Sequence, residues 1–181
     1  ICVATSKKLK DDRIFNYCLL KNINCFRGSL NNVSKRLLDA ANYYKANSFV
    51  RISGDSPLID PGIIKKGISV FNRGDYDLVT NVFPRTYPFG QSIEIIRTSF
   101  FNKIVPKLVT RSDKEHITEY IYKNFRKFKI FNLRNKKDLT SHNFCIDTLQ
   151  DFKRFKKIID KMSDTHLNYN LSELVKLYPS N

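Results

Sequence analysis

Two aspartates stand directly after short apolar stretches, where a carboxylate could reach a bound ligand. Asp55 lies in the segment RISGDSPLIDP, where Gly54 lets the backbone bend and Pro57 stiffens the exit of the turn. Asp147 lies in the segment CIDTLQDF. Mg²⁺ prefers one or two carboxylates together with phosphate oxygens. Two such acids at one edge of a sheet could therefore hold a single metal ion for phosphoryl or nucleotidyl transfer.

Each aspartate also has a simpler structural explanation. Asp55 could be a turn residue that accepts hydrogen bonds from loop amides. Asp147 or Thr148 could cap the helix that follows. For either position alone the structural explanation is the stronger one, and it is the occurrence of both that points to a metal.

The order of the expected elements places these acids in a fold. Apolar runs predict strands over 1–6, 23–26, 48–53, 77–81, 92–96, 128–133 and 143–147. Helices are expected over 12–20, after an N-cap at Ser29, after Asp60-Pro61, from about Ser99, from a capping box over 112–115, after a capping box over 148–151, and over 171–177. This alternation predicts one α/β domain over 1–181, a Rossmann-like, mostly parallel sheet with helices on both faces. Ligands of such sheets bind at the carboxyl ends of the strands, which directs attention to Ser6, Gly28, Asp55, Asn81 and Asp147.

The composition limits the classes of partner. The chain has 181 residues, with 32 Lys and Arg against 17 Asp and Glu, a formal net charge of +15. That charge favours polyanionic partners, although a basic solvated surface is the stronger explanation. The four cysteines show no C-x-x-C spacing, so we expect a reduced, cytoplasmic protein without a zinc site. No apolar run approaches the ~20 residues of a membrane helix, so no membrane partner is expected.

The segment 122–137 mixes basic and aromatic residues and could form a platform for single-stranded nucleic acid. Its apolar spacing is instead typical of core positions at a helix end and in a strand. We therefore expect Phe125, Phe128, Ile130 and Leu133 to be buried, which argues against nucleic-acid binding.

Two further polar residues are candidates for substrate contacts. Glu94 lies in an expected strand and could accept a hydrogen bond from a sugar hydroxyl; otherwise it is a solvent-facing carboxylate. His116 lies near an expected helix start and could contact substrate or a second subunit; otherwise it belongs to the capping turn.

Seven segments in order carry a resemblance to a known family. These are VATS, FRGS, VRISGDSPLIDP, YDLVTN, FPRTYPFG, EHITEYI and CIDTLQDF. Together they resemble the cytidylyltransferase group of sugar nucleotidyltransferases, in particular the spore-coat polysaccharide biosynthesis type, which is related to the acylneuraminate cytidylyltransferases. The resemblance covers essentially the whole chain.

The resemblance implies a reaction and a set of roles. A sugar hydroxyl would attack the α-phosphate of CTP, releasing pyrophosphate and giving a CMP-sugar for surface polysaccharide or glycan biosynthesis. Asp55 and Asp147 would be the catalytic residues, acting as the Mg²⁺ ligands. Residues near the nucleotide or sugar would be Arg51, Gly54, Pro57 and Asn81. The family also implies a homodimer that pairs through the segment 84–90 and the strand after it.

Two departures from the family pattern keep alternatives open. The Gly-, Arg- and Lys-containing loop that cradles the triphosphate is missing, so we expect an N-terminally incomplete domain that binds CTP only weakly on its own. Phe89 and Ser92 stand where many relatives have Asp, which leaves the sugar open. The alternatives are a basic α/β binding module for nucleic acid or a partner, and a non-catalytic family member that binds a sugar or partner.

Overall fold

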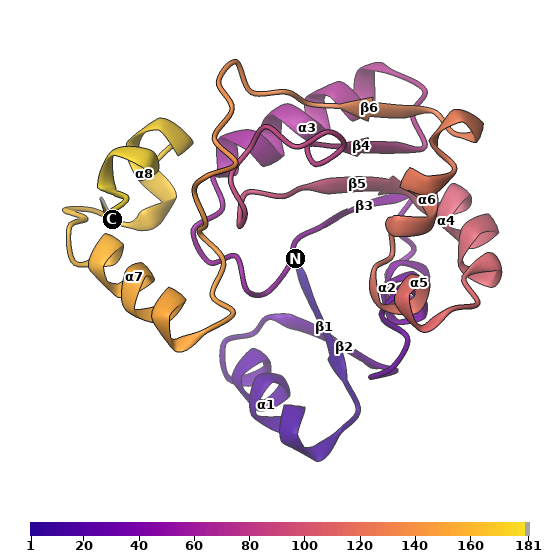
Figure 1. Ribbon diagram of the computed structural model, residues 1–181. Coiled ribbons are helices and arrows are strands. Elements are labelled where there is room, and N and C mark those ends of the chain that lie inside the picture. Colours follow the sequence, from indigo (N-terminus) through magenta and orange to yellow (C-terminus); the bar gives the residue numbers. More distant parts are fainter. Residues whose placement is uncertain (180–181) are drawn as a thin grey trace. The chain divides into compact units, whose positions relative to one another are not determined.

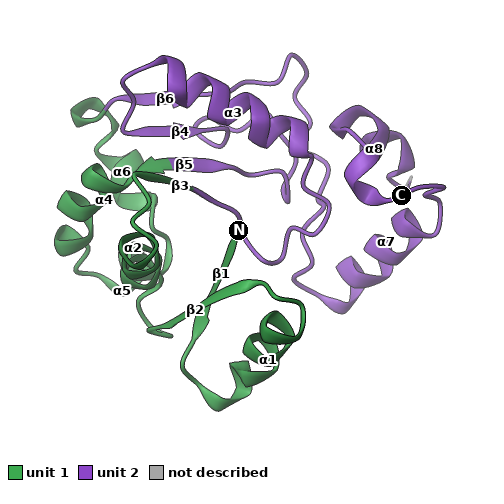
Figure 2. Cartoon of the chain, turned by 180° about the vertical axis from the view of Figure 1, so that it is seen from behind, with its two compact units in different colours: residues 1–49, 96–128 green, residues 50–95, 129–181 purple. Residues whose placement is uncertain are grey.

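The computed structural model describes residues 1–179 and divides into two compact units (Figure 2). The first unit comprises residues 1–49 and 96–128, and the second comprises residues 50–95 and 129–181, of which 180–181 are not described. Each unit is described by itself below.

The first unit is built on two parallel strands, β1 (Cys2–Ser6) and β2 (Asn24–Gly28), which pair from Cys2 opposite Asn24 to Ser6 opposite Gly28. Helix α1 (Asp12–Leu20) connects them, in agreement with the predicted strand–helix–strand order. Helix α2 (Val33–Tyr43) follows β2.

The N-cap predicted for α2 is wrong. Asn32 caps the helix, because its side-chain oxygen accepts a hydrogen bond from the Lys35 amide at 2.8 Å. Ser29 lies one turn earlier, and its hydroxyl accepts a hydrogen bond from the Asn32 amide at 3.1 Å. Both residue types suit a cap, so sequence spacing alone could not separate them.

Short helices complete the first unit: α4 (Thr98–Ile104), α5 (Arg111–Glu115) and α6 (Glu119–Lys123), with 3₁₀ turns at Leu9–Asp11, Val105–Lys107 and Phe125–Lys127. The predicted capping box over 112–115 is wrong by two residues. Thr110 accepts from the Asp113 amide at 3.1 Å, and the Asp113 carboxylate accepts from the Thr110 amide at 3.3 Å. Helix α5 therefore begins one residue before Ser112.

The second unit contains most of a four-stranded sheet in the order β3 (Ser48–Arg51), β5 (Glu94–Arg97), β4 (Leu78–Thr80) and β6 (Ile130–Asn132). Strands β4 and β6 are parallel. Helix α3 (Pro61–Arg73) lies along the sheet (Figure 1), and Gly67 lets it approach closely. A Cβ at position 67 would come within 2.5 Å of the Ile93 side chain.

Asp60 caps α3 as predicted, accepting from the Gly62 amide at 2.6 Å. Its other carboxylate oxygen accepts from the Leu171 amide at 2.8 Å, which joins α3 to α8 (Leu171–Leu177). The core of this unit comprises Leu58, Ile63, Phe71, Val79, Tyr87, Ile93, Ile95, Leu133, Phe144, Ile158, Leu171 and Leu174.

Helix α7 (Leu149–Ile159) begins with the predicted capping box of Thr148 and Asp151, and a 3₁₀ turn at His166–Asn168 precedes α8. The strand predicted over 143–147 is wrong. This segment is extended, with a single parallel bridge between Asn143 and Phe89. Its amides donate to loop carbonyls and to side chains rather than to a neighbouring strand, so no ladder forms.

The predicted α/β class is confirmed, with parallel pairs in both sheets. Among residues 1–179, no helix is both long and apolar enough to cross a membrane.

Candidate metal and nucleotide sites

Asp55 lies in the turn after β3 and is exposed to solvent. Its carboxylate accepts a hydrogen bond from the Ser56 hydroxyl at 2.8 Å, and the Ser56 amide closes the turn onto the Ser53 carbonyl at 3.3 Å. The backbone at Gly54 does not use a left-handed conformation, so the bend does not require glycine. A Cβ at position 54 would meet no atom within 4 Å, so the space beside this turn is open. Pro57 is half-buried at the exit of the turn.

Asp147 is also exposed, and it is brought beside Asp55 by the backbone. The Ile146 amide donates to the Asp55 carbonyl at 2.9 Å. Asp147 therefore directly follows Ile146, whose backbone is hydrogen-bonded to that of Asp55. The expectation that both acids lie at one edge of the fold is met in the geometry, although Asp147 follows an extended segment and not a strand.

The thiol of Cys145 lies in the field of both carboxylates. Burial raises the pKa of Cys145, and the negative charges of Asp55 and Asp147 add to that increase. A hydrogen bond with Ser56 and the positive charge of Arg85 act in the opposite direction. Both aspartates therefore lie near the Cys145 thiol.

A loop that contains Phe89 borders the same segment on its other side. The Phe144 amide donates to the Phe89 carbonyl at 2.9 Å. The ring of Phe89 is 48% exposed, with the Arg85 guanidinium 4.5 Å from its centre. Gly90 has a φ of 81°, and a Cβ there would come within 2.6 Å of the Phe144 carbonyl carbon. Glycine is thus required at position 90, where the loop and the segment meet closely.

Arg51 and Glu94, both predicted to contact substrate, contact each other. The guanidinium of Arg51 lies 2.8 Å from the Glu94 carboxylate and donates to the Ser53 hydroxyl at 3.3 Å. The Glu94 side chain is only 4% exposed, against 28% for Arg51. Glu94 is therefore a buried, ion-paired carboxylate and not the solvent-facing one weighed as its alternative.

Asn81 is fully buried, and both ends of its amide bind backbone. Its Nδ2 donates to the Gln91 carbonyl at 2.7 Å, and its Oδ1 accepts from the Ile93 amide at 2.9 Å. These bonds fix the approach to β5. A role in nucleotide or sugar binding stays a prediction for this residue.

His116 is exposed at the C-terminal end of α5, in the first unit, and not at a helix start. Its backbone amide donates to the Ser112 carbonyl at 2.7 Å, and its carbonyl accepts from the Glu119 amide at 3.0 Å. The backbone thus forms a turn between α5 and α6. A contact of its imidazole with substrate stays a prediction.

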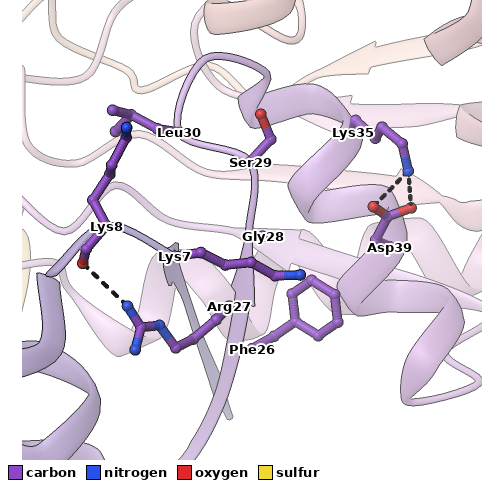
Figure 3. A pocket seen from close by; sticks show the side chains of 9 residues that line it. All are labelled: Lys7, Lys8, Phe26, Arg27, Gly28, Ser29, Leu30, Lys35 and Asp39. Atoms are coloured by element: carbon purple, nitrogen blue, oxygen red, sulfur yellow. Dashed lines mark hydrogen bonds and ion pairs between the residues drawn. The ribbon is translucent and has the colours of Figure 1, made fainter.

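A basic cavity of about 540 Å³ lies at the carboxyl ends of β1 and β2, within the first unit (Figure 3). Its lining residues are Lys7, Lys8, Phe26, Arg27, Gly28, Ser29, Leu30, Lys35 and Asp39. Arg27 is held in place, since it donates to the Ser6 carbonyl at 3.0 Å and the Lys8 carbonyl at 3.1 Å and pairs with Asp12 at 2.7 Å. Sequence reasoning singled out the two strand ends but assigned no role to these basic residues.

The charge of this cavity suits an anionic ligand. Two of its cations already have a carboxylate partner, since Lys35 is paired with Asp39 at 2.6 Å (Figure 3) and Arg27 with Asp12. Lys7 and Lys8 are exposed and follow β1 directly. The signal that could have found them was available, because two lysines directly follow a predicted parallel strand.

The two aspartates fit a magnesium ion by the chemistry of their donors. Among residues 1–179, no group of three or more His, Cys, Asp or Glu side chains could hold a metal. Mg²⁺ does not require such a cage, because it usually keeps several waters and is held by one or two carboxylates plus substrate phosphates. The exposed carboxylates of Asp55 and Asp147 match that pattern.

The segment 122–137 is less buried than the core interpretation predicts, although two of its rings pack against other aromatic rings. The rings of Phe128 and Phe100 lie 5.1 Å apart, and those of Phe131 and Tyr76 lie 5.3 Å apart. Leu133 is buried, whereas Phe128 and Ile130 are half-buried. Phe125 is 46% exposed, so the prediction that it is buried is wrong. It belongs to a 3₁₀ turn with Arg126 5.7 Å from its ring centre.

Comparison with known proteins then decides the family. A family model described as cytidylyltransferase matches residues 1–177. The chain belongs to the cytidylyltransferase family. Among solved structures, the chain is similar to one titled as a cytidylyltransferase from Leptospira borgpetersenii serovar Hardjo-bovis. The TM-score is 0.92 at 31% identity, covering 97% of this chain and 74% of the other.

Two curated relatives are also similar to this chain. Uncharacterized protein MJ1063 of Methanocaldococcus jannaschii is 32% identical over 157 residues, 86% of this chain and 63% of that protein. Spore coat polysaccharide biosynthesis protein SpsF of Bacillus subtilis is 26% identical over 187 residues, 100% of this chain and 75% of that protein. The match thus spans less than two thirds of the length of MJ1063.

Proposed function

We propose that this cytidylyltransferase transfers a cytidylyl group from CTP to a sugar hydroxyl in the synthesis of a surface polysaccharide or glycan. The hydroxyl oxygen forms a bond to the α-phosphorus as the bond from the α-phosphorus to the bridging oxygen breaks. Pyrophosphate leaves with that oxygen, and the hydroxyl proton passes to solvent. Support comes from family membership and from the name of the Bacillus subtilis relative.

The observation that carries this proposal is the hydrogen bond from the Ile146 amide to the Asp55 carbonyl, which brings two exposed aspartates together. Asp55 and Asp147 would hold Mg²⁺ between them. When bound, the ion supplies Lewis-acid polarisation of a phosphate and neutralises charge in the transition state. The two side chains would hold it.

The cavity of the first unit would bind an anionic group through Lys7, Lys8 and Arg27. Arg27 is oriented by two backbone carbonyls, so its guanidinium is held in place before a ligand arrives. Lysine acts there as a mobile point charge. In the second unit, Arg51 would orient the Glu94 carboxylate toward a sugar hydroxyl.

Measuring pyrophosphate release and CMP-sugar formation, by mass spectrometry with CTP, Mg²⁺ and a panel of monosaccharides, tests this function. Asp55→Asn and Asp147→Asn should each lower turnover about 10²–10³-fold, because metal stabilisation is worth several kcal/mol at roughly 1.4 kcal/mol per tenfold. Asp138→Asn is the matched control, since Asp138 is another exposed loop aspartate. Unchanged turnover in both Asp55→Asn and Asp147→Asn would contradict the assignment of these two residues as metal ligands.

Two other functions make different predictions. A nucleic-acid module would bind DNA or RNA with steep salt dependence, lost on charge reversal within 122–137. The ring contacts of Phe128 and Phe131 leave fewer aromatic faces for stacking and favour the enzyme. A non-catalytic family member would bind a sugar or partner and show no response to CTP.

A further inference from the structure

The segment that carries Asp147 lacks the support of a strand, so something else must hold it. Only one bridge, from Asn143 to Phe89, joins residues 143–147 to a neighbouring segment in strand-like pairing within the described chain. The carboxylate of Asp147 is exposed, so its position depends on how its backbone is fixed.

Asp151 fixes the end of this segment. One oxygen of its carboxylate accepts from the amides of Asp147 at 3.2 Å and Thr148 at 2.8 Å. The same oxygen accepts from the Thr148 hydroxyl at 2.8 Å. The backbone of the candidate metal ligand is therefore bonded directly to the first turn of α7.

Arg154, one turn further along α7, fixes the start of the segment. Its Nε donates to the Asn143 carbonyl at 3.1 Å. Another nitrogen of the same guanidinium, Nη2, pairs with the second oxygen of Asp151. Tyr178 covers the group, with its ring centre 5.8 Å from the guanidinium carbon and its hydroxyl accepting from the Asn143 amide at 3.2 Å.

We infer that Arg154 is a positioning residue for the proposed metal site, acting through Asp151 and the Asn143 carbonyl to fix the backbone that carries Asp147. One guanidinium contacts the start of the segment directly and its end through the Asp151 carboxylate, a geometry that a planar fork of donors allows and a lysine does not. The Arg154 and Asp151 side chains are 23% and 11% exposed, so solvent screens the pair only in part. This inference rests on the proposed function for its metal, though the clamp itself is a property of the protein alone.

Hydrogen exchange of backbone amides tests the clamp without metal or substrate. In Arg154→Met, which keeps an apolar stem, the amides of Ile146, Asp147 and Thr148 should exchange at least about tenfold faster, as expected when about 1.4 kcal/mol of protection is lost. In Arg154→Lys, the exchange rates of these amides should lie between those of the wild-type protein and those of Arg154→Met. The matched control is Lys123→Met, which removes another ion pair within one helical turn, to Glu119 at 2.6 Å.

The second readout is the Mg²⁺ concentration that gives half of the thermal shift with CTP. It should rise about 10–100-fold in Arg154→Met, the range typical for groups that orient metal ligands, and turnover should recover at saturating Mg²⁺. A lower melting temperature with unchanged exchange at 146–148 and unchanged Mg²⁺ dependence would overturn the inference. If the wild-type protein shows no Mg²⁺ response that depends on Asp55 and Asp147, the metal role of Arg154 fails with the proposed function, while the exchange result still decides the clamp.

Discussion

At the scale of the residue, the two aspartates are distinguished by exposure and by the bonds of their neighbours. Asp55 and Asp147 are exposed, whereas Asp60 and Asp151 are buried and accept backbone amides. Sequence reasoning selected the first pair from their place after apolar runs. It could not assign Arg154, because the contact with Asp151 is an ordinary i,i+3 pair of the predicted helix and the bond to the Asn143 carbonyl exists only in the folded loop.

Substitution by alanine should destabilise the protein at one glycine of the site and leave its stability nearly unchanged at another. Gly90→Ala should destabilise the protein by at least about 1–3 kcal/mol, because its left-handed backbone and the Phe144 carbonyl leave no room for a Cβ. Gly54→Ala should change the free energy of unfolding by within about 0.5 kcal/mol, as for an open surface position. Urea unfolding of both variants checks this. Equal losses would contradict the assignment of strain to position 90.

The exposed lysines of the basic cavity should contribute to nucleotide affinity. Replacing Lys7 and Lys8 together with Gln should weaken CTP binding by roughly 5–30-fold, the equivalent of one or two kcal/mol. The control is the same double change at Lys65 and Lys66, an adjacent exposed pair on α3. Isothermal titration with CTP measures both, and equal affinities in the two double variants would exclude the cavity as the phosphate site.

At the scale of the element, helix ranges and caps were predicted correctly where the local sequence is compatible with only one structure. The ranges of α1 and α8 and the Thr148–Asp151 box match their predictions. Predictions failed where two caps competed, as for Ser29 and Asn32, or where tertiary bonds replaced a ladder, as in 143–147. An extended apolar run has the same sequence pattern whether its amides bind a strand or a loop, so this difference was not predictable.

Acid should weaken the start of α7 through Asp151. Hydrogen bonds from Thr148, followed by the contact with Arg154, lower the pKa of Asp151 from 3.8 to about 2. A lowered pKa in the folded state means that the unfolded chain binds more protons in this range, so stability rises with pH there. The stabilising effect is complete above about pH 4 and is lost as the pH falls toward 2.

Denaturant unfolding between about pH 2 and 6 checks this dependence. The wild-type protein should lose stability along that acid limb, and Asp151→Asn should lose less because its side chain does not titrate. Parallel curves for the two proteins would show that Asp151 does not carry the effect.

At the scale of the whole molecule, the net charge of +15 attracts any anionic ligand that approaches the protein. The comparisons show the family and the fold of the chain. Part of the positive charge lies on the lysines and the arginine that line the cavity. Whether the molecule pairs into the expected homodimer through 84–90 stays a prediction, which light scattering in solution decides.

CTP binding should weaken with salt. Raising the ionic strength from about 0.01 M to 0.15 M shortens the screening length from about 30 Å to 8 Å, so long-range attraction between the basic chain and a triphosphate falls. Uncharged cytidine is the matched ligand control and should bind with little salt dependence. A salt-independent affinity for CTP would exclude an electrostatic contribution from the basic surface.

The most direct test of the central account is the thermal shift produced by CTP and Mg²⁺ together, because it requires no knowledge of the sugar. A ligand that binds only the folded state raises the melting temperature according to its affinity. The account predicts a shift in the wild-type protein and in Asp138→Asn that needs Mg²⁺, and its loss in Asp55→Asn and in Asp147→Asn. An equal Mg²⁺-dependent shift in all four proteins would contradict the claim that these two aspartates hold the metal.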